Sequence, residues 1–172
     1  TAKDFKYIPE LDFALKIMKS SVTNGLNILL YGNPGTGKSE FSKMLAKEAN
    51  KNLYTVGENS EGENADNYRL KALYRNLTVA SKNKNICLLF DEAEDIFSGI
   101  RTKINKVEIN RLLEENKSPI IWCTNNIRAM DRAFVRRFTL AIHFQTPPLE
   151  VRQSIWNKYL QDSSICKMEM LK

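Results

Sequence analysis

Short apolar runs alternate with amphipathic stretches along most of this chain. Apolar runs of the kind that form buried strands cover residues 26–31, 53–56, 86–90, 120–124 and 140–144. Apolar residues at helical spacing predict helices at residues 9–23, 40–50, 68–80, 106–115, 130–137 and 150–160. Strands that alternate with helices form mostly parallel sheets covered on both faces, so we predict a three-layer α/β/α sandwich.

Polar segments and helix-breaking residues separate these elements. Asn24-Gly25 ends the first predicted helix, and Pro147-Pro148 interrupts the chain before the last one. Residues 1–8 are polar and mixed, and Tyr7-Ile8-Pro9 is expected to be an entry segment to the first helix. Residues 57–67 contain almost nothing apolar and predict an exposed loop.

The composition is that of an ordinary globular domain. Of the 172 residues, 42% are hydrophobic and 27% are charged. No apolar run approaches the ~18 residues that a membrane-spanning helix needs, so we expect no membrane partner. The cysteines are Cys87, Cys123 and Cys166, and the first two lie in predicted strands. They are typical of core residues rather than of a disulfide framework, which favours a cytoplasmic location.

The chain carries a formal net charge of +6. A basic balance of this size raises the question of nucleic-acid binding. The lysines and arginines are, however, spread along the whole chain and form no dense block. This distribution favours a solvated surface around a phosphate-binding site, and it supports nucleic-acid binding only weakly.

One Gly-rich segment between a predicted strand and a predicted helix carries the clearest chemistry. It matches G-x-x-x-x-G-K-[ST] without a gap, and its residues are Gly32, Asn33, Pro34, Gly35, Thr36, Gly37, Lys38 and Ser39. The glycines let successive N–H groups point inward as an anion-binding nest, to which the helix dipole adds. Lys38 is placed to reach the outer phosphates of a nucleotide, and the Ser39 hydroxyl to bind Mg²⁺. The alternative is a Gly-rich turn that only happens to precede a helix.

Two acids follow directly after the apolar run at residues 86–90. Asp91 and Glu92 are therefore expected at the carboxyl edge of the sheet, where ligands bind in open α/β folds. Asp91 is suited to hold Mg²⁺, directly or through water, and Glu92 is placed to polarise an attacking water. The alternative is an acidic helix start, because acids are favoured at helix N-termini.

Two later segments complete the candidate site. The apolar run at residues 120–124 is followed by Asn125, whose amide is placed to orient water or to contact a γ-phosphate. Arg136 and Arg137 are bracketed by apolar residues, an arrangement that suits a bidentate contact to phosphate. Taken without the other motifs, Asn125 is also typical of a turn, and both arginines are typical of a solvated helix face.

In their order and spacing, the segments GNPGTGKS, ICLLFDE, IIWCTNN and MDRAFVRRF resemble the ATPase core of the AAA+ superfamily, and more narrowly its AAA branch. The resemblance implies a P-loop fold whose five-stranded parallel sheet has the order 5-1-4-3-2. It implies binding of ATP and ADP, and hydrolysis of ATP with Mg²⁺. It also implies that Lys38 and Ser39 are Walker A contacts, Asp91 the metal ligand, Glu92 the catalytic base and Asn125 sensor 1.

The resemblance covers about residues 8–160, and it further implies an arginine finger that reaches into a neighbouring subunit of a homo-oligomeric ring. The family usually separates the two arginines of this segment, whereas here Arg136 and Arg137 are adjacent. Either one could be the finger. We expect Arg137, because it directly precedes Phe138.

Departures from the family pattern refine the prediction. We expect the nucleotide-binding core over residues 1–148 and only the start of the family's helical lid over residues 149–172. The first residue is Thr1 rather than Met, so we expect an excised domain. Residues 57–67 contain no aromatic residue, so protein unfolding by threading is not supported. His143 lies alone in an alternating strand and is expected to be packed or exposed rather than a ligand.

The sequence therefore predicts an ATPase core that drives conformational change in a larger oligomeric assembly. One alternative is an assembly module that binds ATP and scarcely hydrolyses it, and another is a DNA-directed loader. Glu92 favours the enzyme, because a module that only binds nucleotide needs no base at that position. We expect the macromolecular substrate to be recognised by segments outside this chain.

Overall fold

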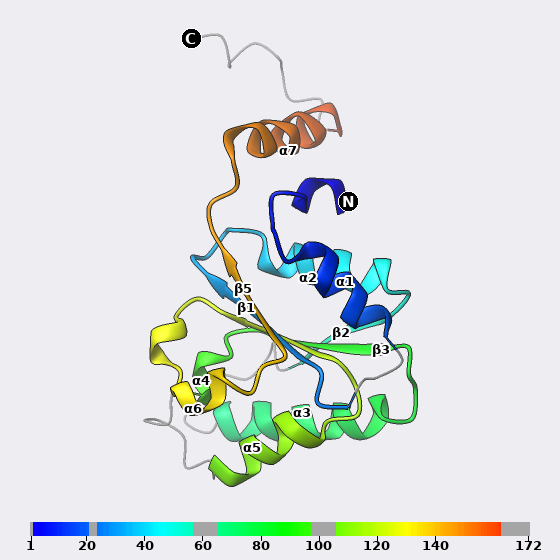
Figure 1. The fold of residues 1–172 in the computed structure, drawn as a ribbon, viewed down its shortest axis with the longest axis vertical. Coiled ribbons are helices and arrows are strands. Elements are labelled where there is room, and N and C mark those ends of the chain that lie inside the picture. The colour runs from blue at the N-terminus through cyan, green and yellow to red at the C-terminus, as the bar shows by residue number, and fades with distance from the viewer. Residues whose placement is uncertain (1, 21–23, 57–64, 98–105, 163–172) are drawn as a thin grey trace.

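The computed structural model describes residues 2–20, 24–56, 65–97 and 106–162 of the chain (Figure 1). Cys166 and most of the loop predicted at residues 57–67 lie outside the described residues. The strands are β1 (Asn27–Gly32), β2 (Asn52–Val56), β3 (Ile86–Phe90), β4 (Ile120–Thr124) and β5 (Leu140–Phe144). The longer helices are α1 (Leu11–Lys19), α2 (Lys38–Glu48), α3 (Ala65–Ala80), α5 (Lys106–Glu115) and α7 (Leu149–Asp162). The short helical turns are η1 (Ala2–Phe5), α4 (Glu94–Phe97), η2 (Ile127–Ala129) and α6 (Arg132–Val135).

The strands form one parallel sheet in the order β2-β3-β4-β1-β5. This is the order 5-1-4-3-2 read from the opposite edge, so that prediction is confirmed. Every residue of β3 and β4 is buried, as expected for central strands of a sheet covered on both faces. β2 and β5 form the edges, and most of their residues are partly or fully exposed.

Alternate side chains of the central strands enter two separate cores on opposite faces of the sheet. Leu29 and Trp122 belong to the core that contains the apolar residues of α3 and α5. Leu30 and Ile121 belong to the core that contains the apolar residues of α1 and α2. Figure 1 shows the two helix pairs on opposite sides of the sheet, which confirms the three-layer α/β/α fold.

The short turns η1, α4 and η2 were not predicted, because three or four residues carry no periodic apolar stripe. The polar, mixed segment at residues 1–8 contains η1. Phe5 of η1 is buried and packs edge-on against Phe41 of α2, with the ring centroids 5.3 Å apart. One aromatic anchor therefore holds the N-terminal turn against the layer that begins at the Gly-rich segment.

The boundaries of predicted helices also shift. α3 begins at Ala65, so the last residues of the predicted loop are helical. The helix predicted over residues 130–137 contracts to α6, because the Asp131 carboxylate accepts a hydrogen bond from the Ala133 N–H at 2.9 Å and caps the helix start.

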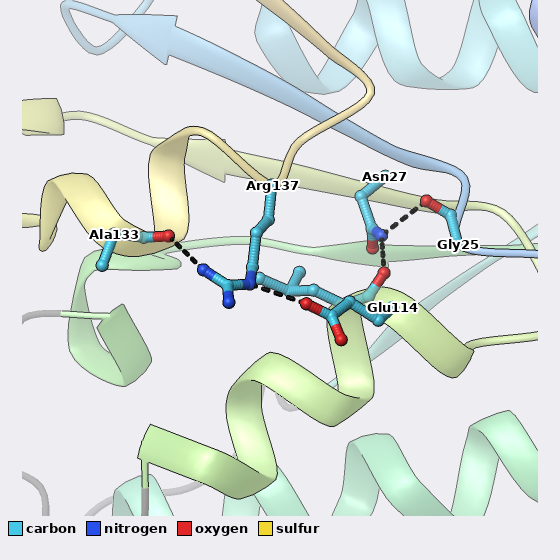
Figure 2. A network of polar contacts seen from close by, with 6 residues as sticks. Gly25, Asn27, Glu114, Ala133 and Arg137 are labelled. Atoms are coloured by element: carbon cyan, nitrogen blue, oxygen red, sulfur yellow. Dashed lines mark hydrogen bonds and ion pairs between the residues drawn. The ribbon is translucent and has the colours of Figure 1, made fainter.

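A buried polar network ties the amino edge of the sheet to the C-terminal end of α5. Asn27 is completely buried, and its amide donates to the carbonyls of Gly25 at 2.9 Å and Leu113 at 2.7 Å. Its Oδ1 accepts a hydrogen bond from the indole N–H of Trp122 at 3.0 Å. Figure 2 shows this amide together with Arg137, which bridges α5 and α6. The single amide therefore satisfies three backbone and side-chain groups, of which those of Leu113 and Trp122 are buried.

We expect Asn27→Ala to lower the free energy of unfolding by about 2–4 kcal/mol, because it leaves several buried polar groups without partners. Urea denaturation would measure the loss. Asn52→Ala is the matched control, because Asn52 lies exposed on the edge strand β2 and should change stability by less than ~0.5 kcal/mol. Equal effects of the two substitutions would contradict a structural role for the Asn27 amide.

Candidate functional site

The segment Gly32–Ser39, called here the phosphate loop, connects the carboxyl end of β1 to the start of α2. Gly37 directly precedes α2 with φ +95°, a left-handed conformation that strains residues with a Cβ atom. At Gly32, with φ +144°, a Cβ atom would collide with the backbone carbonyl of Phe144 on β5. The loop therefore needs glycine at both positions to set its backbone at the N-terminus of a helix.

Lys38, the first residue of α2, is only 7% exposed, and its ammonium group is held inside the phosphate loop. Nζ donates hydrogen bonds to the carbonyls of Gly32 at 2.8 Å and Asn33 at 2.9 Å, and to Oδ1 of Asn125 at 2.8 Å. Burial lowers the pKa of Lys38, because a charged amine loses hydration there. This partly desolvated cation interacts more strongly with an anion than an exposed lysine would.

Asp91 and Glu92 follow β3 at the edge of the sheet where the phosphate loop also begins. Oδ2 of Asp91 lies 3.4 Å from the Ser39 hydroxyl, and Oδ1 accepts a hydrogen bond from the Glu92 N–H at 2.9 Å. Glu92 has φ +54°, which is unusual for a residue other than glycine. Its side chain is 67% exposed, so the carboxylate is open to solvent and to ligands.

Asn125 follows β4, the strand that pairs with β1 and brings the Asn125 amide to the phosphate loop. Its Oδ1 is the side-chain acceptor for Lys38, while its backbone N–H donates to Oε1 of Glu94 at 3.3 Å. Glu94 was not predicted as part of the site. Nothing in its sequence position marks it, since the contact depends on the unpredicted turn α4.

Two cavities adjoin the phosphate loop. One, of about 430 Å³, is lined by Lys38, Ser39, Asp91, Glu92 and Asn125, among others. The second, of about 530 Å³, is bounded by η1, the loop and α7. The two cavities share Gly35, Gly37 and Glu40 in their linings, and the second has charged as well as apolar walls, so a ligand larger than a phosphate group can occupy both.

The oxygen atoms of Ser39 and Asp91 fit a magnesium ion. A hydroxyl and a carboxylate are hard oxygen ligands, and the two atoms already lie within 3.4 Å of each other. Mg²⁺ is commonly held by one or two protein groups together with substrate phosphates, so this small donor set is sufficient. Among the described residues, no group of three or more His, Cys, Asp or Glu side chains forms an alternative metal centre.

The two candidate finger arginines differ in their surroundings. The Arg137 side chain is 26% exposed. Its Nε donates a hydrogen bond to Oε1 of Glu114 at 2.9 Å, and a terminal nitrogen donates one to the Ala133 carbonyl at 2.9 Å (Figure 2). Arg136 is exposed and lines a cavity of about 680 Å³ together with Arg128 and Arg132. The geometry therefore favours Arg136 over Arg137 as the arginine available to another subunit, while the finger assignment itself stays a prediction.

The remaining sequence predictions concern residues away from the phosphate loop. Cys87 and Cys123 are buried in the core as free thiols, and burial raises the pKa of each to about 12. His143 is exposed and stacks on Tyr31 with the ring centroids 4.9 Å apart. Within the described part of the chain, no helix is both long and apolar enough to cross a membrane.

The sequence matches a known family over most of its length. The family model described as "ATPase family associated with various cellular activities (AAA)" matches residues 28–146, more than half of the chain. A putative 26S proteasome regulatory subunit homolog from Methanothermobacter thermautotrophicus is 30% identical over 148 residues. That match covers 78% of this chain and 39% of the relative, so the chain spans well under half of that protein's length.

Solved structures support the same fold. The FIGL-1 AAA domain in complex with ADP is similar with a TM-score of 0.61 at 22% identity, covering 94% of this chain and 57% of that one. A structure that describes the basis of katanin self-assembly is similar with a TM-score of 0.62 at 21% identity, covering 80% of this chain and 46% of that one. At these identities the likeness establishes the fold.

Proposed function

Because this chain belongs to the AAA family of ATPases, we propose that it binds ATP with Mg²⁺ at the phosphate loop and hydrolyses it to ADP. The observation that carries the proposal is the convergence of Lys38, Ser39, Asp91 and Asn125 at one edge of the sheet. Contacts of 2.8 Å between Lys38 and Asn125 and of 3.4 Å between Ser39 and Asp91 join three segments that lie far apart in the sequence. The ADP complex of the similar FIGL-1 domain supports the choice of ligand.

The phosphates would lie on the backbone N–H groups of the loop, at the N-terminus of α2. Lys38 would exchange its hydrogen bonds to the loop carbonyls and to Asn125 for bonds to the β- and γ-phosphates. Mg²⁺ held by Ser39 and Asp91 would neutralise charge on the same phosphates.

Glu92 and Asn125 would act on the water that attacks the γ-phosphate. Both side chains line the cavity beside the loop, and the Glu92 carboxylate is exposed there. A carboxylate orients water and accepts its proton, and an amide donates to water or to phosphate oxygen. Apart from this proton transfer, catalysis of phosphoryl transfer depends on positioning the reactants and on stabilising the charge of the transition state.

The second cavity would hold the nucleoside. It lies against the same loop and is bounded by Phe5 and Tyr7 of the N-terminal segment and by Val151 and Ile155 of α7. Its aromatic and aliphatic walls suit a base, and the charged side chains that also line it suit the polar groups of a nucleoside. In this proposal, residues 1–148 are the nucleotide-binding core, and α7 begins a lid that covers the nucleoside.

The ATPase would drive conformational change in a larger homo-oligomeric assembly. Self-assembly of the similar katanin supports this step. The exposed Arg136, in a cavity with two further arginines, supplies a cationic surface that a neighbour's nucleotide could complete. The katanin comparison, together with this surface, supports hydrolysis at a subunit interface.

We expect Lys38→Ala in the full-length protein to weaken nucleotide binding by ~100-fold or more, because the phosphates lose the lysine of the phosphate loop in a site that concentrates negative charge. Calorimetry with Mg²⁺ and a non-hydrolysable ATP analogue measures the affinity. Lys16→Ala removes an equal charge from the exposed face of α1 and should leave the affinity unchanged. A Lys38→Ala protein with near-parental affinity would rule out the phosphate-loop assignment.

A further inference from the structure

Arg69 of α3 is a buried charged residue that the sequence motifs do not identify. It is only 6% exposed, whereas arginine is rarely buried unless its charge is paired. Its guanidinium carbon lies 4.6 Å from the centroid of the Phe90 ring, in a cation–π arrangement. One terminal nitrogen donates to the backbone carbonyl of Asp91, and the other lies 3.9 Å from Oε2 of Glu92. A single guanidinium therefore contacts three consecutive residues at the end of β3.

These contacts act on the peptide bond that precedes Glu92. Arg69 donates to the carbonyl oxygen of that peptide, and Oδ1 of Asp91 accepts from its N–H at 2.9 Å. The carbonyl and the N–H of this peptide are thus both hydrogen-bonded. Glu92 then follows with φ +54°, a left-handed conformation that costs free energy in a residue with a side chain and persists only when its surroundings hold it.

The Glu92 carboxylate lacks a comparable restraint of its own, since its side chain is 67% exposed. Its direction is therefore set chiefly by the backbone at residues 91–92 and by the ion pair with Arg69. An exposed ion pair alone would contribute little, but here one partner is buried and rigidly placed over Phe90.

We propose that Arg69 is a positioning residue for ATP hydrolysis. It holds the Asp91–Glu92 peptide and the Glu92 carboxylate in the orientation from which Glu92 acts on the attacking water. This inference rests on the proposed function, in which Glu92 is the base. Small errors in the placement of a catalytic group have large effects on rate, so a residue that fixes this peptide controls turnover without touching the nucleotide.

The test replaces Arg69 in the full-length protein with methionine, which keeps a long apolar stem over Phe90 and removes the charge and the donors. We expect kcat to fall by ~10-fold or more while the affinity for a non-hydrolysable ATP analogue stays within ~2-fold. Arg69→Lys keeps a cation beside Glu92 but not the planar fork, so its kcat should lie between those of Arg69→Met and the wild type. Arg75→Met on the exposed face of α3 is the matched control and should leave kcat unchanged.

The same substitution in a Glu92→Gln background separates positioning from a structural role. If Arg69 acts through Glu92, Arg69→Met should lower the residual rate by less than ~2-fold in that background. Equal losses in both backgrounds, or a loss of nucleotide affinity in parallel with thermal stability, would overturn the proposal. If Arg69→Met does not fold, Arg69→Lys carries the test, and a wild-type kcat in that variant would overturn it. A wild-type protein no faster than Glu92→Gln would instead contradict the proposed role of Glu92.

Discussion

Mixing Arg136→Ala and Lys38→Ala variants of the full-length protein should restore ATPase activity that neither variant has alone. An arginine finger stabilises charge on the transferring phosphoryl group and is worth about 10³–10⁵-fold in rate. A subunit with Arg136→Ala keeps its pocket, and one with Lys38→Ala keeps its finger. Some interfaces in the mixed assembly then pair an intact pocket with an intact finger, and the steady-state rate of ATP hydrolysis measures the recovery.

The same mixture made with Arg137→Ala distinguishes the two adjacent arginines. The Arg137 guanidinium is already bound to Glu114 of α5 and to the Ala133 carbonyl, so its loss should reduce stability rather than remove a finger. Arg136 is exposed in the arginine-lined cavity. We therefore expect ATPase activity to recover when Arg136→Ala is mixed with Lys38→Ala. Arg137→Ala alone should lose little ATPase activity beyond what its lower stability causes. If neither mixture recovers activity although mixed assemblies form, the finger does not act across the interface.

Much of the fold could be predicted from the sequence, because the central strands are continuous apolar runs. The runs at 86–90 and 120–124 became β3 and β4 without a change of boundary, since buried parallel strands need apolar residues on both faces. The strand order came from the family resemblance, because local pattern does not say which strands are neighbours. The turn at Ala2–Phe5 could not be found, since its one anchor, Phe5, is recognisable only when Phe41 is placed beside it.

The site was predictable where the chemistry is carried by contiguous residues. The phosphate loop and the pair Asp91-Glu92 each occupy one segment, and their residue types are specific enough to mark the chemistry. Arg69 and the contrast between Arg136 and Arg137 depend on how α3 and α6 pack, which no local pattern records. An arginine in a helix is ordinarily solvated, so burial alone reveals that Arg69 differs from Arg75.

Glu92→Gln should separate nucleotide binding from hydrolysis. The amide keeps the shape of the side chain and a hydrogen bond but does not accept the proton of the attacking water, so turnover should fall by about 10²–10⁴-fold. The affinity for ATP should stay nearly unchanged, because the phosphate contacts proposed for Lys38 and the loop remain. Glu115→Gln is the matched control, since its side chain is 63% exposed on α5, and it should keep the parental rate.

The most direct test of the ATPase assignment is the rate of ATP hydrolysis by full-length Glu92→Gln protein at saturating ATP and Mg²⁺. We expect a loss of at least ~100-fold from the parental rate, with nucleotide still bound. Hydrolysis at the parental rate would show that Glu92 is only an acidic residue at the end of β3, and it would contradict the proposed catalytic site.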